Sequence, residues 1–322
     1  MTWRSPTTGF RRKRAAQTVP PEAPQPQRFD GNTAERPPRA VPVGATRWRP
    51  QTAWVAIAIS FGITVGARSI VRSGGDPRLA VAVAMIALTL APVGVVLLLA
   101  SHHERPRAAD FGLRRPPLAL ATGLVIAVLG ATLVLSAVWA VSLGIDEDAP
   151  DVTDRLAATS GTLNAILVLV LVAVATPLAE EFLFRGFLFR ALHNWRGFWP
   201  AAVSSSAVFA AFHVGWLPIV FVVPAGVFGL GACLLYRWTS SLYPALAMHA
   251  VLNSIGFAPA MGWTWHLPPV IGFSVATTIA IARLIALLLG EGRGPLPAEA
   301  TGDARVGDLR PARTDRQAGR GH

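Results

Sequence analysis

The sequence has one cysteine, one lysine and few charged residues of either sign. A single cysteine, Cys233, excludes an intrachain disulfide framework and any metal site built from several cysteines. Charged residues make up 15% of the chain and hydrophobic residues 52%, with a mean hydropathy of +0.46. This balance is too apolar for an ordinary soluble domain. There is also no Gly-rich phosphate loop and no convincing internal repeat. The composition therefore predicts a multi-span membrane protein.

The first 50 residues lack an apolar segment, which argues against a cleaved signal peptide. They hold ten of the 29 basic residues and are rich in proline. We interpret residues 1–50 as a disordered basic tail that acts as a cytoplasmic topology signal. Nucleic-acid binding is the alternative reading of such a tail, and we predict no nucleic-acid partner. Residues 291–322 are predicted to form a second disordered tail.

The apolar runs predict an all-α, polytopic membrane bundle with about eight transmembrane helices, since about 20 apolar residues cross a bilayer. Seven is the competing count, because only "GW" separates the fifth run from the sixth. The fourth run is too long for one crossing, so we expect it to bend near Pro177 or to extend past the hydrocarbon. Residues 51–160 would hold the first three helices and residues 161–290 the catalytic core. The eight predicted helices are Thr52–Val71, Arg78–Ala100, Pro117–Leu143, Thr162–Leu192, Trp199–Val214, Leu217–Tyr236, Ser241–Ala260 and Pro268–Gly290.

Arginines in the short loops predict that both termini are cytoplasmic. The loop after the second run is basic, whereas "GIDEDAPDVTDR" after the third run has five acids and one arginine. The first outer loop departs from this scheme, because it carries Arg68, Arg72 and Arg78. With arginine outnumbering lysine 28 to 1, as is typical of a GC-rich genome, we expect a bacterial plasma membrane.

Only two of the 18 acids lie within a predicted transmembrane run, and they are adjacent: Glu180 and Glu181. Among the seven histidines, only His213 and His249 lie well inside such runs, and Asn253 follows one turn after His249. Ionisable groups at membrane depth are costly, and they usually mark functional sites. These five side chains are therefore the candidate site.

Helical geometry separates the two glutamates. Glu181 and Arg185 are four residues apart on one face, so we predict an ion pair that reduces the cost of burying both charges. Glu180 points about 100 degrees away, and this leaves it available for chemistry. At about 1.5 Å per helical residue, the four side chains can meet at a similar depth, and we expect access from the cytoplasmic side.

Three segments carry a family resemblance. "EEFLFR" (Glu180–Arg185), "FAAFH" (Phe209–His213) and "HAVLN" (His249–Asn253) occur in that order, each within a predicted helix. They resemble the EExxxR, FxxxH and HxxxN motifs of the CPBP family, which contains the CAAX prenyl proteases and bacteriocin-processing enzymes. The similar region is under a third of the chain. The resemblance implies an intramembrane endopeptidase with Glu180, His213, His249 and Asn253 as its catalytic residues. "FGLRRPP" also resembles a segment that is common in this family.

The same residues suit peptide hydrolysis on chemical grounds. The reaction needs an activated water, a place for the developing oxyanion and a protonated leaving amine. Glu180 would take the proton of a water held by His213, and either residue would pass a proton to the leaving nitrogen. His249 and Asn253 would present N–H donors to the oxyanion. Glu181, Arg185 and Phe209 are expected to support these four.

No metal or other cofactor is expected, because HExxH is missing and Asn253 suits an oxyanion donor better than a zinc ligand. The alternative is a zinc-dependent intramembrane metalloprotease with Glu180, His213 and His249 as ligands. Two other function classes stay open. One is a proton-coupled transporter, because carboxylates and histidines also build proton relays. The other is a non-catalytic immunity or scaffold protein. The expected partners are membrane lipid and a peptide or membrane-protein substrate, with or without a lipid attached.

Overall fold

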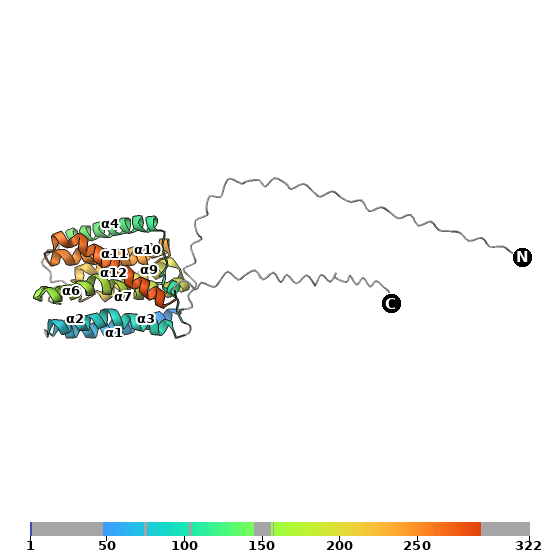
Figure 1. The fold of residues 1–322 in the computed structure, drawn as a ribbon, viewed down its shortest axis with the longest axis horizontal. Coiled ribbons are helices and arrows are strands. Elements are labelled where there is room, and N and C mark those ends of the chain that lie inside the picture. Colours follow the sequence, from blue (N-terminus) through green and yellow to red (C-terminus); the bar gives the residue numbers. More distant parts are fainter. Residues whose placement is uncertain (2–47, 74–75, 103–104, 145–155, 157, 291–322) are drawn as a thin grey trace, which may run out of the picture. The chain divides into compact units, whose positions relative to one another are not determined.

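The computed structural model describes residues 1, 48–73, 76–102, 105–144, 156 and 158–290, and these residues form a helical bundle (Figure 1). The predictions for the two tails and the acidic loop concern segments that lie outside this description almost entirely. The helices are α1 (Pro50–Arg72), α2 (Pro77–Met85), η1 (Ile86–Leu90), α3 (Ala91–Ala100), η2 (Ala108–Phe111), α4 (Leu118–Ser142), η3 (Ala158–Ser160), α6 (Thr162–Val170), η4 (Leu171–Ala175), α7 (Thr176–Glu181), η5 (Phe182–Phe189), α8 (Arg190–Arg196), α9 (Phe198–Phe212), η6 (Ile219–Phe221), α10 (Val222–Thr239), α11 (Tyr243–Ala260), η7 (Thr264–His266) and α12 (Leu267–Leu288).

The predicted polytopic bundle is confirmed, and each of the eight predicted runs is helical over most of its length. Among the described residues, six helical segments are long and apolar enough to cross a membrane, so the chain is a multi-pass membrane protein. The other two runs are α9, with 15 residues, and α11, with 18 residues that include His249 and Asn253. The polar residues lower the hydropathy of α11, and α9 is short because Gly197, with φ of +81°, starts it directly after α8.

The fourth run, Thr162–Arg196, lies at the centre of the bundle and α4 at its edge. Half of the most apolar window of Thr162–Arg196 is buried, against 6% for α4, which is at the top in Figure 1. Within the long helix every residue from 181 to 192 is buried. An element covered by protein on all sides can keep a charged pair away from lipid, which is what the paired glutamates require.

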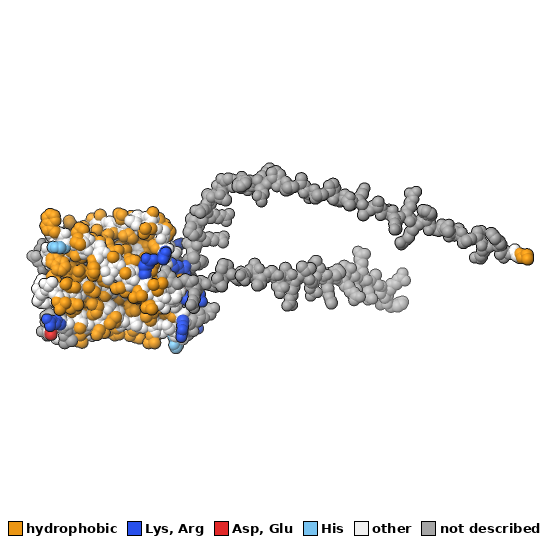
Figure 2. All heavy atoms as spheres, viewed as in Figure 1, with side chains coloured by type: hydrophobic (Ala, Val, Ile, Leu, Met, Phe, Trp, Pro, Cys, Tyr) orange, Lys and Arg blue, Asp and Glu red, His pale blue; other side chains and the backbone are white. Residues whose placement is uncertain are grey.

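Arginines mark one end of the bundle. The loop 105–117 meets the α10–α11 junction there, because Leu242 N–H donates to Gly112 O over 2.8 Å and Ser241 Oγ donates to Arg114 O over 2.6 Å. Exposed basic side chains gather near this end in Figure 2, a smaller basic cluster lies at the opposite end, and hydrophobic side chains are abundant between them. The exposed arginines near this end include Arg105, Arg107 and Arg115 in the loop, Arg196 at the end of α8 and Arg237 in the last turn of α10. We call this the basic end, and the end with residues 213–221 the far end.

The arginine distribution predicts a cytoplasmic basic end and an external far end. Cysteine labelling can test this prediction, because the only native cysteine, Cys233, is 0% exposed. In a Cys233→Ala background, Trp265→Cys at the far end should react with a membrane-impermeant maleimide on intact cells, since Trp265 is 92% exposed. Arg115→Cys should react only after permeabilisation. The reverse pattern would overturn the predicted orientation.

Candidate active site

Glu180 and Glu181 lie on α7, between two π-helical segments of the central helix. Pro177 accounts for the first segment, because it has no N–H to bond Val172 O or Ala173 O. Thr176 N–H bonds Leu171 O, five residues back, so Val172 O has no partner within the helix. The sequence predicted a bend near Pro177, and the structure has a wider, π-helical turn in η4 just before this proline. Segments of this kind are frequent at functional sites.

Glu181 points into the protein, where it pairs with Arg185 as predicted. Arg185 Nη1 lies 2.9 Å from Glu181 Oε1, and both side chains are 0% exposed. Arg185 Nη2 donates to Gly229 O over 3.0 Å, and the guanidinium lies 4.5 Å from the centre of the Phe209 ring. The charge of Arg185 is thus met by a carboxylate, a carbonyl and an aromatic face.

His213 follows the last residue of α9, and that position fixes its ring. Carbonyls in the last turn of a helix have no intrahelical partner. The backbone N–H of His213 donates to Ala210 O, which leaves Phe209 O to accept from His213 Nδ1 at 2.9 Å. Because Nδ1 carries the proton, neutral His213 presents a lone pair at Nε2. The phenylalanine of the FxxxH segment therefore orients the histidine through its backbone carbonyl.

His249 and Asn253 lie one turn apart on α11 and both reach the central helix. His249 Nδ1 donates to Glu181 Oε1 over 2.9 Å, so neutral His249 also presents a lone pair at Nε2. Asn253 Nδ2 donates to Val172 O over 2.7 Å, the carbonyl that Pro177 leaves unpaired. One amide hydrogen of Asn253 is left for another acceptor.

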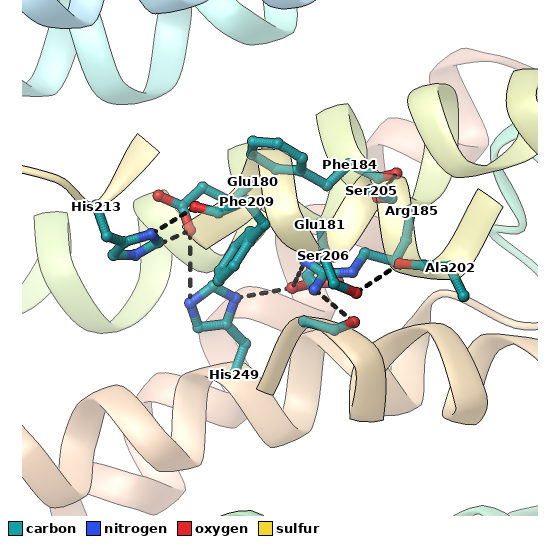
Figure 3. A network of polar contacts seen from close by, with 11 residues as sticks. Glu180, Glu181, Phe184, Arg185, Ala202, Ser205, Ser206, Phe209, His213 and His249 are labelled. Carbon is teal, nitrogen blue, oxygen red and sulfur yellow. Dashed lines mark hydrogen bonds and ion pairs between the residues drawn. The ribbon is translucent and has the colours of Figure 1, made fainter. Parts of the chain in front are cut away.

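Glu180 meets both histidines at one point (Figure 3). Its Oε2 atom is 3.9 Å from His213 Nε2 and 3.7 Å from His249 Nε2. These separations are too long for hydrogen bonds, and separations of this size invite a bridging water. Glu180 Oε2 is buried and has no hydrogen-bond partner in the part of the chain that the structure describes. Three acceptors, one carboxylate oxygen and two ring nitrogens, therefore face a position that only a hydrogen donor or a cation can fill.

A cavity of about 150 Å³ borders this cluster. Its polar lining includes Glu180, His213 and Asn253, and most of its wall is apolar, with contributions from η1, α3 and the central helix. A cavity with apolar walls and a few convergent polar groups is typical of a binding or active site.

The cavity lies toward the far end, which is the external end in the predicted orientation, whereas the sequence predicted access from the cytoplasmic side. Leu156, Trp216 and Leu217 line it, and these residues belong to the far-end loops. Toward the basic end, buried Phe111 stacks on Phe182 at 4.2 Å, and Trp48 lies 4.8 Å from Phe111 and from Phe187. This aromatic layer comes from "FGLRRPP" and the start of α1, and it separates the glutamates from the basic end.

The zinc alternative requires that the three acceptors lie at ligand distance from one ion. Tetrahedral zinc with ligand bonds near 2.0–2.1 Å sets neighbouring donor atoms about 3.4 Å apart. The Glu180 oxygen is 3.7 and 3.9 Å from the two ring nitrogens, and no metal-holding group of three or more His, Cys, Asp or Glu is present among the described residues. The two separations exceed the zinc value by a few tenths of an ångström, whereas the Nδ1 partners of both histidines resemble the supporting contacts of metal-bound histidines.

Sequence reasoning missed two features of this site. Glu181 contacts His249 as well as Arg185, a contact that helical spacing within one element cannot reveal. Trp216 lines the cavity, but in the sequence it looks like one more tryptophan near a membrane interface. Its position after His213, in "HVGW", is the only signal that could have indicated it.

Comparison with protein families agrees with this geometry. The model of the type II CAAX prenyl endopeptidase Rce1-like family matches residues 162–255, the stretch that holds all four proposed catalytic residues. Searches of curated proteins and of solved structures give no match to this chain. Within the matched stretch, Glu180, His213 and Asn253 line one cavity, and His249 lies between Glu180 and Glu181. The family match thus covers the part of the chain that carries all three motifs, and it agrees with their resemblance to the CAAX-type (CPBP) intramembrane endopeptidases.

Proposed function

We propose that this chain hydrolyses a peptide bond with a water molecule activated by Glu180 and His213. The observation that carries the proposal is the convergence of Glu180 Oε2, His213 Nε2 and His249 Nε2, where the buried Glu180 oxygen has no hydrogen-bond partner among the described residues. A water placed there donates one hydrogen to the Glu180 carboxylate and the other to His213, and its oxygen is left to attack a carbonyl carbon.

The reaction then uses groups whose orientation is already fixed. Glu180 takes the water proton as the oxygen bonds to the carbonyl carbon, and it passes this proton to the nitrogen that leaves. The developing oxyanion receives the remaining amide hydrogen of Asn253. His249 is expected to donate a second hydrogen bond to the oxyanion when its Nε2 carries a proton. The carboxylate of Glu181, 2.9 Å from Nδ1, would stabilise that cation. The cavity favours cleavage in the half of the bundle toward the far end, instead of near the cytoplasmic face as the sequence predicted.

The substrate class follows from this chemistry as a peptide or membrane protein, with lipid as its surroundings. The experiment is a comparison of protein termini in membranes from cells that express the wild type or Glu180→Gln at matched abundance. We expect new N- and C-termini, paired within one protein, in the wild-type membranes only. Identical termini in the two samples, with both proteins folded and present, would contradict the proposed function.

We expect catalysis to be independent of a bound metal ion, because the HExxH motif is missing and Asn253 suits an oxyanion donor better than a zinc ligand. Purified protein should keep its cleavage rate after exhaustive chelation and should contain no stoichiometric zinc by elemental analysis. The metalloprotease alternative makes the opposite prediction. It requires one zinc per chain that is lost together with activity and restores activity when it is returned.

A further inference from the structure

The loop 213–217 between α9 and α10 lies deeper than an ordinary surface loop. The 15 residues of α9 span about 22 Å, whereas the hydrocarbon core of a bilayer is about 30 Å thick. The loop therefore starts before α9 has crossed the apolar layer. Irregular backbone at such depth needs protein partners or a water-filled cavity.

Protein partners for this loop are present. Arg68 Nη1 donates to Val214 O over 2.6 Å, and Arg72 Nη2 donates to Gly215 O over 3.1 Å. Gly215 has a φ of +86°, and a Cβ atom there would come 1.7 Å from Arg68 Nη1, so only glycine admits this contact. The arginines at the far end, which the loop-charge pattern did not explain, hold the loop that joins His213 to Trp216.

Trp216, also in this loop, has an indole N–H without a hydrogen-bond partner among the described residues. It is 7% exposed and lines the cavity with Glu180 and His213, and its buried Nε1–H has no partner in the described part of the chain. By contrast, Trp139 Nε1 on α4 donates to Val220 O over 2.7 Å, just beyond the same loop. A buried donor without a partner needs an explanation, and a ligand that completes the bond is one.

Among the described residues that line the cavity, two buried polar atoms have no partner, the acceptor Glu180 Oε2 and the donor Trp216 Nε1. Asn253 uses one amide hydrogen on Val172 O, and nearby His249 Nδ1 bonds Glu181. To hydrogen-bond both atoms, the contents of the cavity must donate a hydrogen to Glu180 Oε2 and offer an oxygen lone pair to Trp216 Nε1–H. Water and a peptide carbonyl together have this chemistry.

We propose that the indole N–H of Trp216 donates a hydrogen bond to a backbone carbonyl of the substrate peptide. The proposal rests on the proposed endopeptidase function and extends it, because it adds a substrate-binding residue on the loop that Arg68 and Arg72 hold. No covalent step involves Trp216. Its bond orients the peptide in the cavity, and it strengthens catalysis if the bonded oxygen gains negative charge during attack.

The test uses two replacements of Trp216. β-(3-Benzothienyl)alanine keeps the shape of the side chain and has sulfur in place of the N–H. The variant Trp216→Phe removes the N–H together with part of the ring system. With a peptide taken from the wild-type-only cleavage sites, kcat/KM should fall about 10- to 100-fold in both variants. The melting temperature of the benzothienyl variant should not change, because the protein loses no internal hydrogen bond. Trp238→Phe, at a tryptophan that is 51% exposed near the basic end, is the matched control and should keep wild-type values.

The outcomes separate this inference from the proposed function. If the benzothienyl variant cleaves as fast as the wild type while Glu180→Gln does not cleave, the endopeptidase function stands and the role of Trp216 is wrong. The role is also wrong if only Trp216→Phe loses activity, because the ring would then matter for packing and not for its N–H. If the wild type and Glu180→Gln yield the same termini, the endopeptidase function itself fails. A fall in kcat at unchanged melting temperature supports the donor role, since a purely structural tryptophan would change the melting temperature first.

Discussion

Glu180→Gln is expected to give a folded, normally abundant protein whose cleavage rate falls about 100- to 10,000-fold, which in most assays is below detection. Glutamine keeps the size of the side chain but cannot take a proton from water. The fold should tolerate the change, because Glu180 Oε2 makes no hydrogen bond to any described residue. The measurement is a cleavage rate on a defined peptide beside a thermal melting curve of the same preparation.

Two companion variants sharpen this result. Glu180→Asp keeps the carboxylate but withdraws it by about one carbon–carbon bond, so we expect a partial loss of rate and an unchanged melting temperature. His213→Gln removes the second acceptor that faces the water, and its rate should fall while its expression stays normal. A Glu180→Gln protein that is folded and cleaves at the wild-type rate would show that Glu180 is not the base.

The members of the site were predictable from the sequence because burial of charge is expensive. Glu180 and Glu181 are the only acids in an apolar run, and His213, His249 and Asn253 repeat the same exception. Spacing within one helix predicted the Glu181–Arg185 pair, which the structure confirms at 2.9 Å. A four-residue separation is set by helix geometry alone, so no knowledge of the tertiary arrangement was needed.

Contacts between elements were not predictable in this way. His249 contacts Glu181 across 68 residues of sequence, and Arg68 contacts Val214 across 146 residues. Such pairs depend on how the helices pack, which periodicity does not encode. The cavity's position toward the far end was missed for the same reason, because the aromatic layer around Phe111 forms only when loop 105–117 folds into the bundle.

The π-helical segment before Pro177 could be predicted only in part from the sequence. Pro177 signalled an irregularity, but its consequence is a free carbonyl at Val172 that Asn253 bonds from another helix. The proline thus connects backbone geometry to the placement of a proposed catalytic residue. Asn253 was predicted as a donor to the oxyanion, and the structure shows that one of its two amide hydrogens has a structural use.

Glu181→Gln is expected to lower stability by roughly 3–5 kcal/mol, the usual cost of removing one partner from a buried ion pair. Glu181 Oε1 lies 2.9 Å from Arg185 Nη1 and 2.9 Å from His249 Nδ1, and the side chains of all three residues are at most 4% exposed. The glutamine oxygen can still accept from His249, so that ring should keep its orientation. Arg185 instead keeps a full charge in an apolar interior without a carboxylate partner.

A double variant distinguishes this stability effect from a catalytic one. Glu181→Gln with Arg185→Gln removes both charges, so it should recover part of the melting temperature and abundance that Glu181→Gln alone loses. The folded fraction of Glu181→Gln should still cleave at a measurable rate, because Glu180, His213 and the His249 contact stay in place. If folded Glu181→Gln is inactive while Glu180→Gln cleaves normally, the two glutamates have the opposite roles. If the double variant is less stable than either single variant, Arg185 is held mainly by Gly229 O and the ring of Phe209, and not by the charge of Glu181.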